Sequence, residues 1–108
     1  MYNVGRGEVI TLAGNLYEKN ISEDALDIHR AISSLIEELE AVDYYNQRAE
    51  ATSDPELKAI MEHHRDEEKE HAAMLIEWLR RKDPTFHKEL KDYLFTEGNL
   101  IALEEKSE

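Results

Sequence analysis

The chain of 108 residues contains no cysteine, which excludes disulfide bonds, zinc–thiolate clusters and a cysteine nucleophile. Histidine, aspartate and glutamate are therefore the protein ligands that remain for a metal ion. No apolar run approaches the ~20 residues of a membrane span, and the first residues lack the basic and then apolar pattern of a signal peptide. These absences predict a soluble, cytoplasmic protein and favour oxygen-rich metal sites.

Positive charge is also scarce, with 13 Lys and Arg against 25 Asp and Glu and a formal net charge of -12. Such a charge repels nucleic acid and anionic membranes and attracts cations to the surface. We therefore expect no nucleic-acid or membrane partner, and a cationic substrate rather than an anionic one. A single domain of this size buries a modest share of its surface, so association with further copies would stabilise it.

Glycine and proline are few, and they mark the ends of the expected helices. Three of the four glycines fall within residues 1–21, which we expect to form an N-terminal arm. Ser22 is placed as the N-cap of a first helix over residues 23–50. Asp54 then caps a second helix, with Pro55 at its first position, that runs to about residue 82.

A second break at Asp83-Pro84 precedes a short amphipathic pattern that ends near Leu94. Gly98 is placed as the C-cap glycine of this third helix. Residues 99–108 are expected to form an acidic tail. Because no strand pattern competes, the sequence predicts an all-α domain over residues 22–98, an antiparallel two-helix hairpin with a short third helix.

Each long helix carries an apolar stripe at the three- and four-residue spacing of a helix face. On the first helix the stripe consists of Ile28, Ala31, Leu35, Glu38, Val42, Tyr45 and Ala49. On the second it consists of Leu57, Met61, His64, Glu68, His71, Leu75 and Trp78. One carboxylate therefore interrupts the first stripe, and a cluster of polar groups interrupts the second.

The register of the hairpin places these interruptions at one level. Glu38 lies 15 residues before Ser53 and Glu68 lies 15 residues after it, so both stand at the same height across the hairpin. Glu68 and His71 form a Glu-x-x-His unit, whose spacing lets a carboxylate and an imidazole reach one ion. The sequence predicts a metal site made by Glu38, Glu68 and His71.

Four-helix di-metal proteins take one Glu from each of two helices and one Glu-x-x-His from each of the other two. This chain has one of each, so a two-fold dimer would complete both the ligand set and a four-helix bundle. Four ionised glutamates and two neutral histidines carry a charge of -4, which two divalent cations cancel. Without metal the carboxylates would repel one another, so we expect metal to tighten dimerisation.

Several interpretations of these residues remain open at this point. A lone Glu-x-x-His occurs by chance on many acidic helices, and the polar cluster could instead be a hydrogen-bond layer that sets helix register. His64 could be a third ligand that binds through nitrogen, a hydrogen-bond partner of a ligand, or a packed side chain. Tyr45 fits a core aromatic or a hydrogen-bond donor to a ligand carboxylate. On the face of Glu37, Glu40 and Tyr44, spacing alone favours a solvated acidic surface over an approach route for cations.

Two segments carry a more specific pattern, EELEAVDYY at residues 37–45 and RDEEKEHAAMLIEWLRR at residues 65–81. With them, residues 22–98 closely resemble the encapsulated ferritins of bacteria and archaea. The resemblance implies a ferritin-like helical hairpin, a di-iron centre at a dimer interface, and dimers assembled into a ring, commonly a decamer. It further implies a ferroxidase that oxidises Fe(II) for mineral storage inside an encapsulin nanocompartment, with two iron ions per dimer.

Carried over by position, the resemblance implies that Glu38, Glu68 and His71 are iron ligands and that Tyr45 stands behind them. It also implies that Glu37 and Glu40 line an acidic approach, where Ca(II) could also bind, which overrides the spacing argument for that face. His64 departs from the family, which has a non-ligating polar residue there, and this histidine could add an accessory metal site. Family members reach the encapsulin shell protein by a short C-terminal targeting peptide or by fusion to it, and no such peptide is visible after Gly98.

Two rival functions use the same residues without iron oxidation. The first is a non-redox module in which Zn(II), Mn(II) or Ca(II) locks a helical oligomer, since affinity order favours other divalent ions over Fe(II). The second is a purely structural oligomer in which the polar cluster only specifies register.

Overall fold

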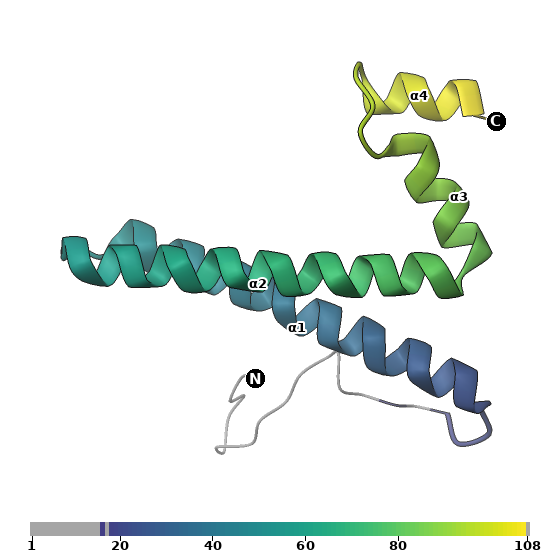
Figure 1. The fold of residues 1–108 in the computed structure, drawn as a ribbon, viewed down its shortest axis with the longest axis horizontal. Coiled ribbons are helices and arrows are strands. Elements are labelled where there is room, and N and C mark those ends of the chain that lie inside the picture. The colour runs from purple at the N-terminus through teal and green to yellow at the C-terminus, as the bar shows by residue number, and fades with distance from the viewer. Residues whose placement is uncertain (1–15, 17, 108) are drawn as a thin grey trace. The chain divides into compact units, whose positions relative to one another are not determined.

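A computed structural model describes Leu16 and residues 18–107, and in this part of the chain all regular structure is helical (Figure 1). The helices are α1 (Glu23–Ala51), α2 (Pro55–Lys82), α3 (Pro84–Tyr93) and α4 (Leu100–Ser107). The predicted all-α hairpin with a short following helix is confirmed. Among the described helices, none combines the length and the hydropathy that a membrane span requires. The predicted arm, residues 1–21, lies largely outside the described residues and stays a prediction.

The chain divides into two units, one up to Ile76 and one from Glu77 onward. In the first unit, side-chain caps set the start of each long helix as predicted. The Ser22 hydroxyl accepts a hydrogen bond from the Ala25 amide at 3.1 Å. The Asp54 carboxylate accepts from two amides of the first turn of α2, at 2.9 and 3.0 Å. These bonds satisfy amides that have no partner within the helix, so helix, turn and helix are specified locally.

The two long helices of the first unit pack as a hairpin through small side chains. Ala31, Ala49 and Ala72 are its buried hydrophobic residues among those described. Between the helices, the Arg65 guanidinium donates a hydrogen bond to the Asn46 side-chain oxygen at 3.1 Å. Because alanines fill the contact, the helices can approach closely, and polar groups at one level of the hairpin come within reach of each other.

The first unit leaves many large apolar side chains exposed. On α1, Ile32, Ile36 and Leu39 form a stripe beside the predicted seam, and on α2 Leu57 and Met74 are exposed as well. A core of three alanines contributes little hydrophobic stabilisation, and exposed apolar side chains at this density are typical of surfaces that another chain covers.

The second unit contains the end of α2, α3 and α4. Helix α3 starts at the predicted break, because the Asp83 carboxylate accepts from the Thr85 and Phe86 amides at 2.9 and 3.0 Å. Leu79 is 1% exposed and is the large side chain that this unit buries completely. Arg80 binds the Glu77 carboxylate through two nitrogens, at 2.6 and 2.7 Å.

The third helix ends near Leu94 as predicted, but the assignment of Gly98 as its C-cap was wrong. Helix α3 ends at Tyr93 with Leu94 as its C-cap, whose amide donates to the Leu90 carbonyl. The residue in the left-handed region after this cap is Phe95, with φ of 59°, and it is fully exposed. Gly98, with φ of 95°, lies farther on and belongs to the turn into α4. The glycine therefore marks the turn that precedes α4 and not the end of α3.

Residues 100–107, expected as part of an acidic tail, form the helix α4 instead. Asn99 caps it, because the asparagine oxygen accepts from the Ala102 amide at 3.0 Å. Helix α4 contacts α3 within the second unit. The four-residue apolar run from Leu100 to Leu103 follows a strong capping residue, and this local signal outweighs the acidic composition of the last residues.

Candidate metal centre

Three side chains from the two long helices meet at one level of the hairpin. Glu38 comes from the middle of α1, and Glu68 and His71 come from adjacent turns of α2. One ligand atom from each lies within 4.8 Å of the others. His71 Nδ1 is 3.6 Å from Glu38 Oε2 and 3.5 Å from Glu68 Oε2. The register argument from the sequence is therefore confirmed: the structure brings these three residues together.

The two distances from His71 to the carboxylates fit a shared cation better than direct hydrogen bonds. Hydrogen bonds from nitrogen to oxygen have lengths of about 2.7–3.2 Å, shorter than both His71 distances. Metal–ligand bonds of about 2.0–2.2 Å instead place two ligand atoms of one ion roughly 3.0–3.6 Å apart. Two carboxylates and an imidazole form a ligand set that suits divalent first-row metals. The triad is thus arranged as a group that could hold a metal ion.

The triad is also open on one side. The side chains of Glu38 and Glu68 are 25% and 24% exposed, and that of His71 is 41% exposed. A metal ion in proteins is commonly bound by four or more ligand groups, and this subunit offers three residues. The exposed side leaves room for further ligands from outside the subunit.

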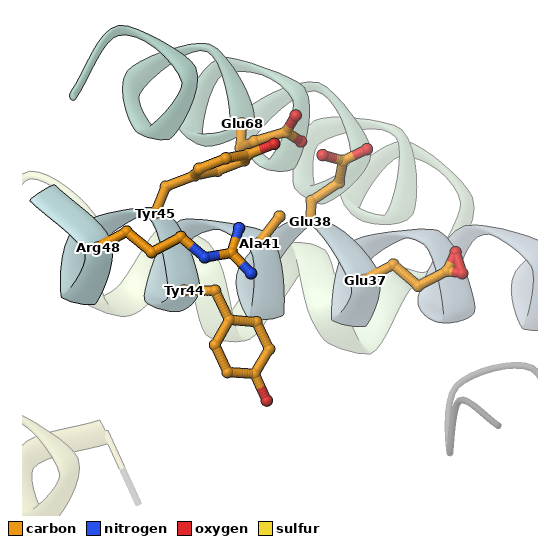
Figure 2. Close-up of a pocket in the computed structure, with 7 residues that line it drawn as sticks. All are labelled: Glu37, Glu38, Ala41, Tyr44, Tyr45, Arg48 and Glu68. Carbon is orange, nitrogen blue, oxygen red and sulfur yellow. The ribbon is translucent and has the colours of Figure 1, made fainter. Parts of the chain in front are cut away.

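A pocket of about 380 Å³ adjoins the triad (Figure 2). Its lining consists of Glu37, Glu38, Ala41, Tyr44, Tyr45, Arg48 and Glu68. Tyr45 and Glu37 line the same pocket as the two triad carboxylates, while Glu40 is half-buried and does not line this pocket. Helical spacing placed Glu37 on a different face of α1 from Glu38. The pocket nevertheless includes residues from both faces.

The histidines near the triad have separate surroundings. His64 is exposed, and its ring meets the Tyr45 ring edge-on with centroids 5.2 Å apart. It is not a member of the triad, and its ring contacts Tyr45 on the opposite helix of the hairpin. His63 Nε2 pairs with the Glu67 carboxylate at 2.8 Å on the exposed side of α2.

Arg48 is the charged pocket residue that the sequence interpretation missed. Its guanidinium carbon lies 5.9 Å from the Tyr44 ring centroid and 5.6 Å from that of Tyr45. The available signal was its position four and three residues after these tyrosines, the spacing at which helix side chains meet. The pocket consequently holds one positive group among its carboxylates.

Comparisons with known proteins all point to one family. The sequence pattern of the EncFtn-like family matches residues 15–97. An encapsulated ferritin-like protein of Rhodospirillum rubrum is 58% identical over 84 residues, which cover 78% of this chain and 60% of that protein. The encapsulin nanocompartment cargo protein EncC of Myxococcus xanthus is 42% identical over 59 residues, which cover 54% of this chain and 45% of that protein. The chain thus spans about half to three-fifths of the length of these two relatives.

A solved structure shares the fold. The crystal structure of protein ne0167 from Nitrosomonas europaea superposes with a TM-score of 0.77 at 63% sequence identity, covering 79% of this chain and 96% of that chain. Over the 79% of the chain that is matched, the helical architecture is therefore common to this chain and to an experimentally determined relative.

Proposed function

The chain belongs to the EncFtn-like family, and on that premise we propose that it is a ferroxidase that oxidises Fe(II) to Fe(III). The proposed reaction takes place at a di-iron site shared by two subunits and serves mineral storage inside an encapsulin nanocompartment. The observation that carries this proposal is the meeting of Glu38, Glu68 and His71 at metal-ligand spacing, on an exposed side of one subunit.

Pairing of two subunits completes the proposed site. A two-fold axis beside the triad repeats it and supplies four carboxylates and two imidazoles, which is the ligand inventory of four-helix di-metal proteins. The exposed stripe of Ile32, Ile36 and Leu39 lies on the same helix as Glu38, and the exposed Met74 lies one turn after His71. Burying these side chains against a second copy would supply the hydrophobic stabilisation that the alanine core lacks.

The residues of the chain have distinct tasks in the proposed reaction. Glu38 and Glu68 neutralise the charge of the substrate ions, and carboxylates can follow the change from Fe(II) to Fe(III) by shifting their binding mode. His71 gives each ion a nitrogen ligand. Two Fe(II) ions release two electrons, which reduce dioxygen to hydrogen peroxide with two protons, or reduce peroxide to water. Tyr45 lies beside the two carboxylates, and we propose that its hydroxyl orients a ligand of the partner subunit.

The acidic pocket supports an approach route for iron. Glu37 lines it together with the two triad carboxylates, and the whole chain has a net charge of -12, so a divalent cation is attracted to this opening. Glu40 lies one turn of α1 from Glu37, and we propose that it extends the route outside the pocket, where Ca(II) can compete.

Storage of the oxidised iron is proposed to require a second protein. The Rhodospirillum relative is named encapsulated and the Myxococcus relative is named encapsulin cargo. We propose by similarity that this chain assembles into a ring of dimers, a decamer, and that the ring works inside an encapsulin shell. The described part of the hairpin, with its alanine core, encloses no mineral cavity of its own, and so we propose that oxidation and storage are divided between two proteins.

Anaerobic loading followed by air separates this function from a non-redox metal module. The protein is equilibrated with Fe(II) without oxygen, air is admitted, and the ferric-oxo absorbance is followed. We expect fast formation in the wild type and loss of the fast phase in Glu38→Ala, Glu68→Ala and His71→Ala. Glu50→Ala, at an exposed position of α1 outside the pocket, is the matched control and should react as the wild type does. Tight binding of Fe(II) without faster oxidation would refute the ferroxidase and leave the non-redox module.

A further inference from the structure

Arg48 differs from the other arginines in the described part of the chain. Arg30, Arg65, Arg80 and Arg81 each lie within 3.0 Å of a carboxylate oxygen. Around Arg48, no described carboxylate lies within ion-pair distance, although three line the same pocket. In an acidic chain, a guanidinium held away from nearby carboxylates keeps its positive charge available to the pocket.

Two tyrosine rings hold the guanidinium in this position. Figure 2 shows the Arg48 side chain passing between Tyr45 and Tyr44 towards Ala41, and all four residues line the pocket. The guanidinium carbon lies within 6 Å of both ring centroids, the range of a cation–π contact. The rings stabilise the cation without neutralising it, whereas a salt bridge to Glu37 or Glu38 would both neutralise the charge and occupy a carboxylate.

A fixed positive charge beside a cation site weakens cation binding in proportion to the charge of the bound ion. Arg48 lines the same pocket of about 380 Å³ as both triad carboxylates, and the Debye length is ~8 Å at physiological ionic strength, so salt screens the guanidinium only partly from an ion at the triad. Its repulsion of a trivalent ion is one and a half times as large as its repulsion of a divalent ion at the same place. The charge therefore acts more strongly on an oxidised product than on its ferrous substrate.

We propose that Arg48 is a specificity-determining residue that weakens the hold of the pocket on Fe(III) more than its hold on Fe(II). Carboxylates bind trivalent ions more tightly than divalent ions, so a site made only of carboxylates would retain its product. Arg48 reduces the difference in affinity between Fe(III) and Fe(II), and this favours release of Fe(III) for mineralisation. The inference rests on the proposed function, because it takes Fe(II) as substrate and Fe(III) as product of the same site.

The test uses two non-redox ions of similar size and different charge, Ca(II) and Tb(III). Tb(III) affinity is measured by luminescence sensitised through Tyr44 and Tyr45, and Ca(II) affinity by competition. In Arg48→Gln we expect Ca(II) to bind about fivefold and Tb(III) about tenfold more tightly than in the wild type. Arg48→Lys keeps the charge and should stay within about twofold of the wild type. At 1 M salt, where the Debye length falls to ~3 Å, the differences should nearly disappear.

Three results would overturn the charge effect and leave Arg48 as a packing residue. The affinities for the two ions could change equally in Arg48→Gln, they could stay unchanged, or Arg48→Lys could behave as Arg48→Gln does. Glu38→Ala separates this failure from that of the metal site. If tyrosine-sensitised Tb(III) binding is unchanged in Glu38→Ala, the proposed site itself is wrong, and the inference fails with it. If binding requires Glu38 and ignores Arg48, only the inference about Arg48 fails.

Discussion

Removing metal should weaken the pairing of two subunits, because pairing brings together carboxylates that only metal neutralises. The ligand oxygens of Glu38 and Glu68 lie within 4.8 Å of each other in one subunit. Two ionised carboxylates at that separation repel by about 1 kcal/mol in water and by about 3.5 kcal/mol at an effective dielectric constant of 20. A closed dimer interface excludes water and doubles the number of carboxylates, so its repulsion lies towards the upper value or above it.

Metal binding relieves this repulsion, so metal binding and subunit pairing are thermodynamically linked. An ion that binds only the paired form stabilises it by about 2.7 kcal/mol per site at a concentration one hundred times its Kd. Two sites then contribute about 5.4 kcal/mol, which lowers the dimer dissociation constant by about 10⁴-fold. The chain with metal should therefore be paired at concentrations where the chain with chelator is dissociated.

Sedimentation equilibrium with anaerobic Fe(II) and with chelator measures this directly. The double variant Glu38→Gln/Glu68→Gln removes the repulsion and most of the metal affinity, so its association should ignore metal and exceed that of the metal-free wild type. Glu50→Gln, which removes one exposed charge outside the pocket, serves as the control. Equal association of the wild type with metal and with chelator would refute the reasoning.

Three further predictions concern single side chains. Tyr45→Phe should lower metal affinity about tenfold while leaving helix content unchanged, as measured by metal titration and circular dichroism, because the hydroxyl no longer supports a ligand carboxylate; unchanged affinity would assign the ring to packing alone. Leu79→Ala should lower the free energy of unfolding by about 2–5 kcal/mol in urea titrations, since the side chain is 1% exposed; a loss below 1 kcal/mol would contradict its core role. Hydrogen bonds from Arg80 and then Arg81 lower the pKa of Glu77 to about 2. The stability that this depressed pKa contributes is present above the unfolded-state pKa of about 4.5 and is lost as pH falls towards 2. Glu77→Gln should therefore show a shallower decline of the urea midpoint over that pH range, and a decline as steep as that of the wild type would refute the assignment.

Much of the fold could be predicted because its signals are local. Ser22, Asp54 and Asp83 each cap a helix with their own side chain, so the helix starts depend on a few adjacent residues. The two errors also have local causes. Gly98 adopts a positive φ as glycines do, but Phe95 takes the left-handed position after α3. Asn99 caps α4 in a segment whose acidic composition suggested a tail.

The triad could be predicted because helix geometry is regular over the distance that matters. Counting equal numbers of residues on both sides of the turn placed Glu38 opposite Glu68, and the helical spacing added His71. The pocket could not be predicted in the same way. Its lining joins residues from two faces of α1, and the position of Arg48 depends on side-chain rotamers and ring contacts that spacing does not determine.

The central claim is that one subunit holds half of a di-iron site. Native mass spectrometry of the anaerobic protein with and without Fe(II) tests it most directly, because it reports subunit number and bound iron together. We predict that single subunits carry no iron and that assemblies of even subunit number carry two iron ions per pair. Single subunits that carry iron with full occupancy, or dimers that carry none, would contradict the claim.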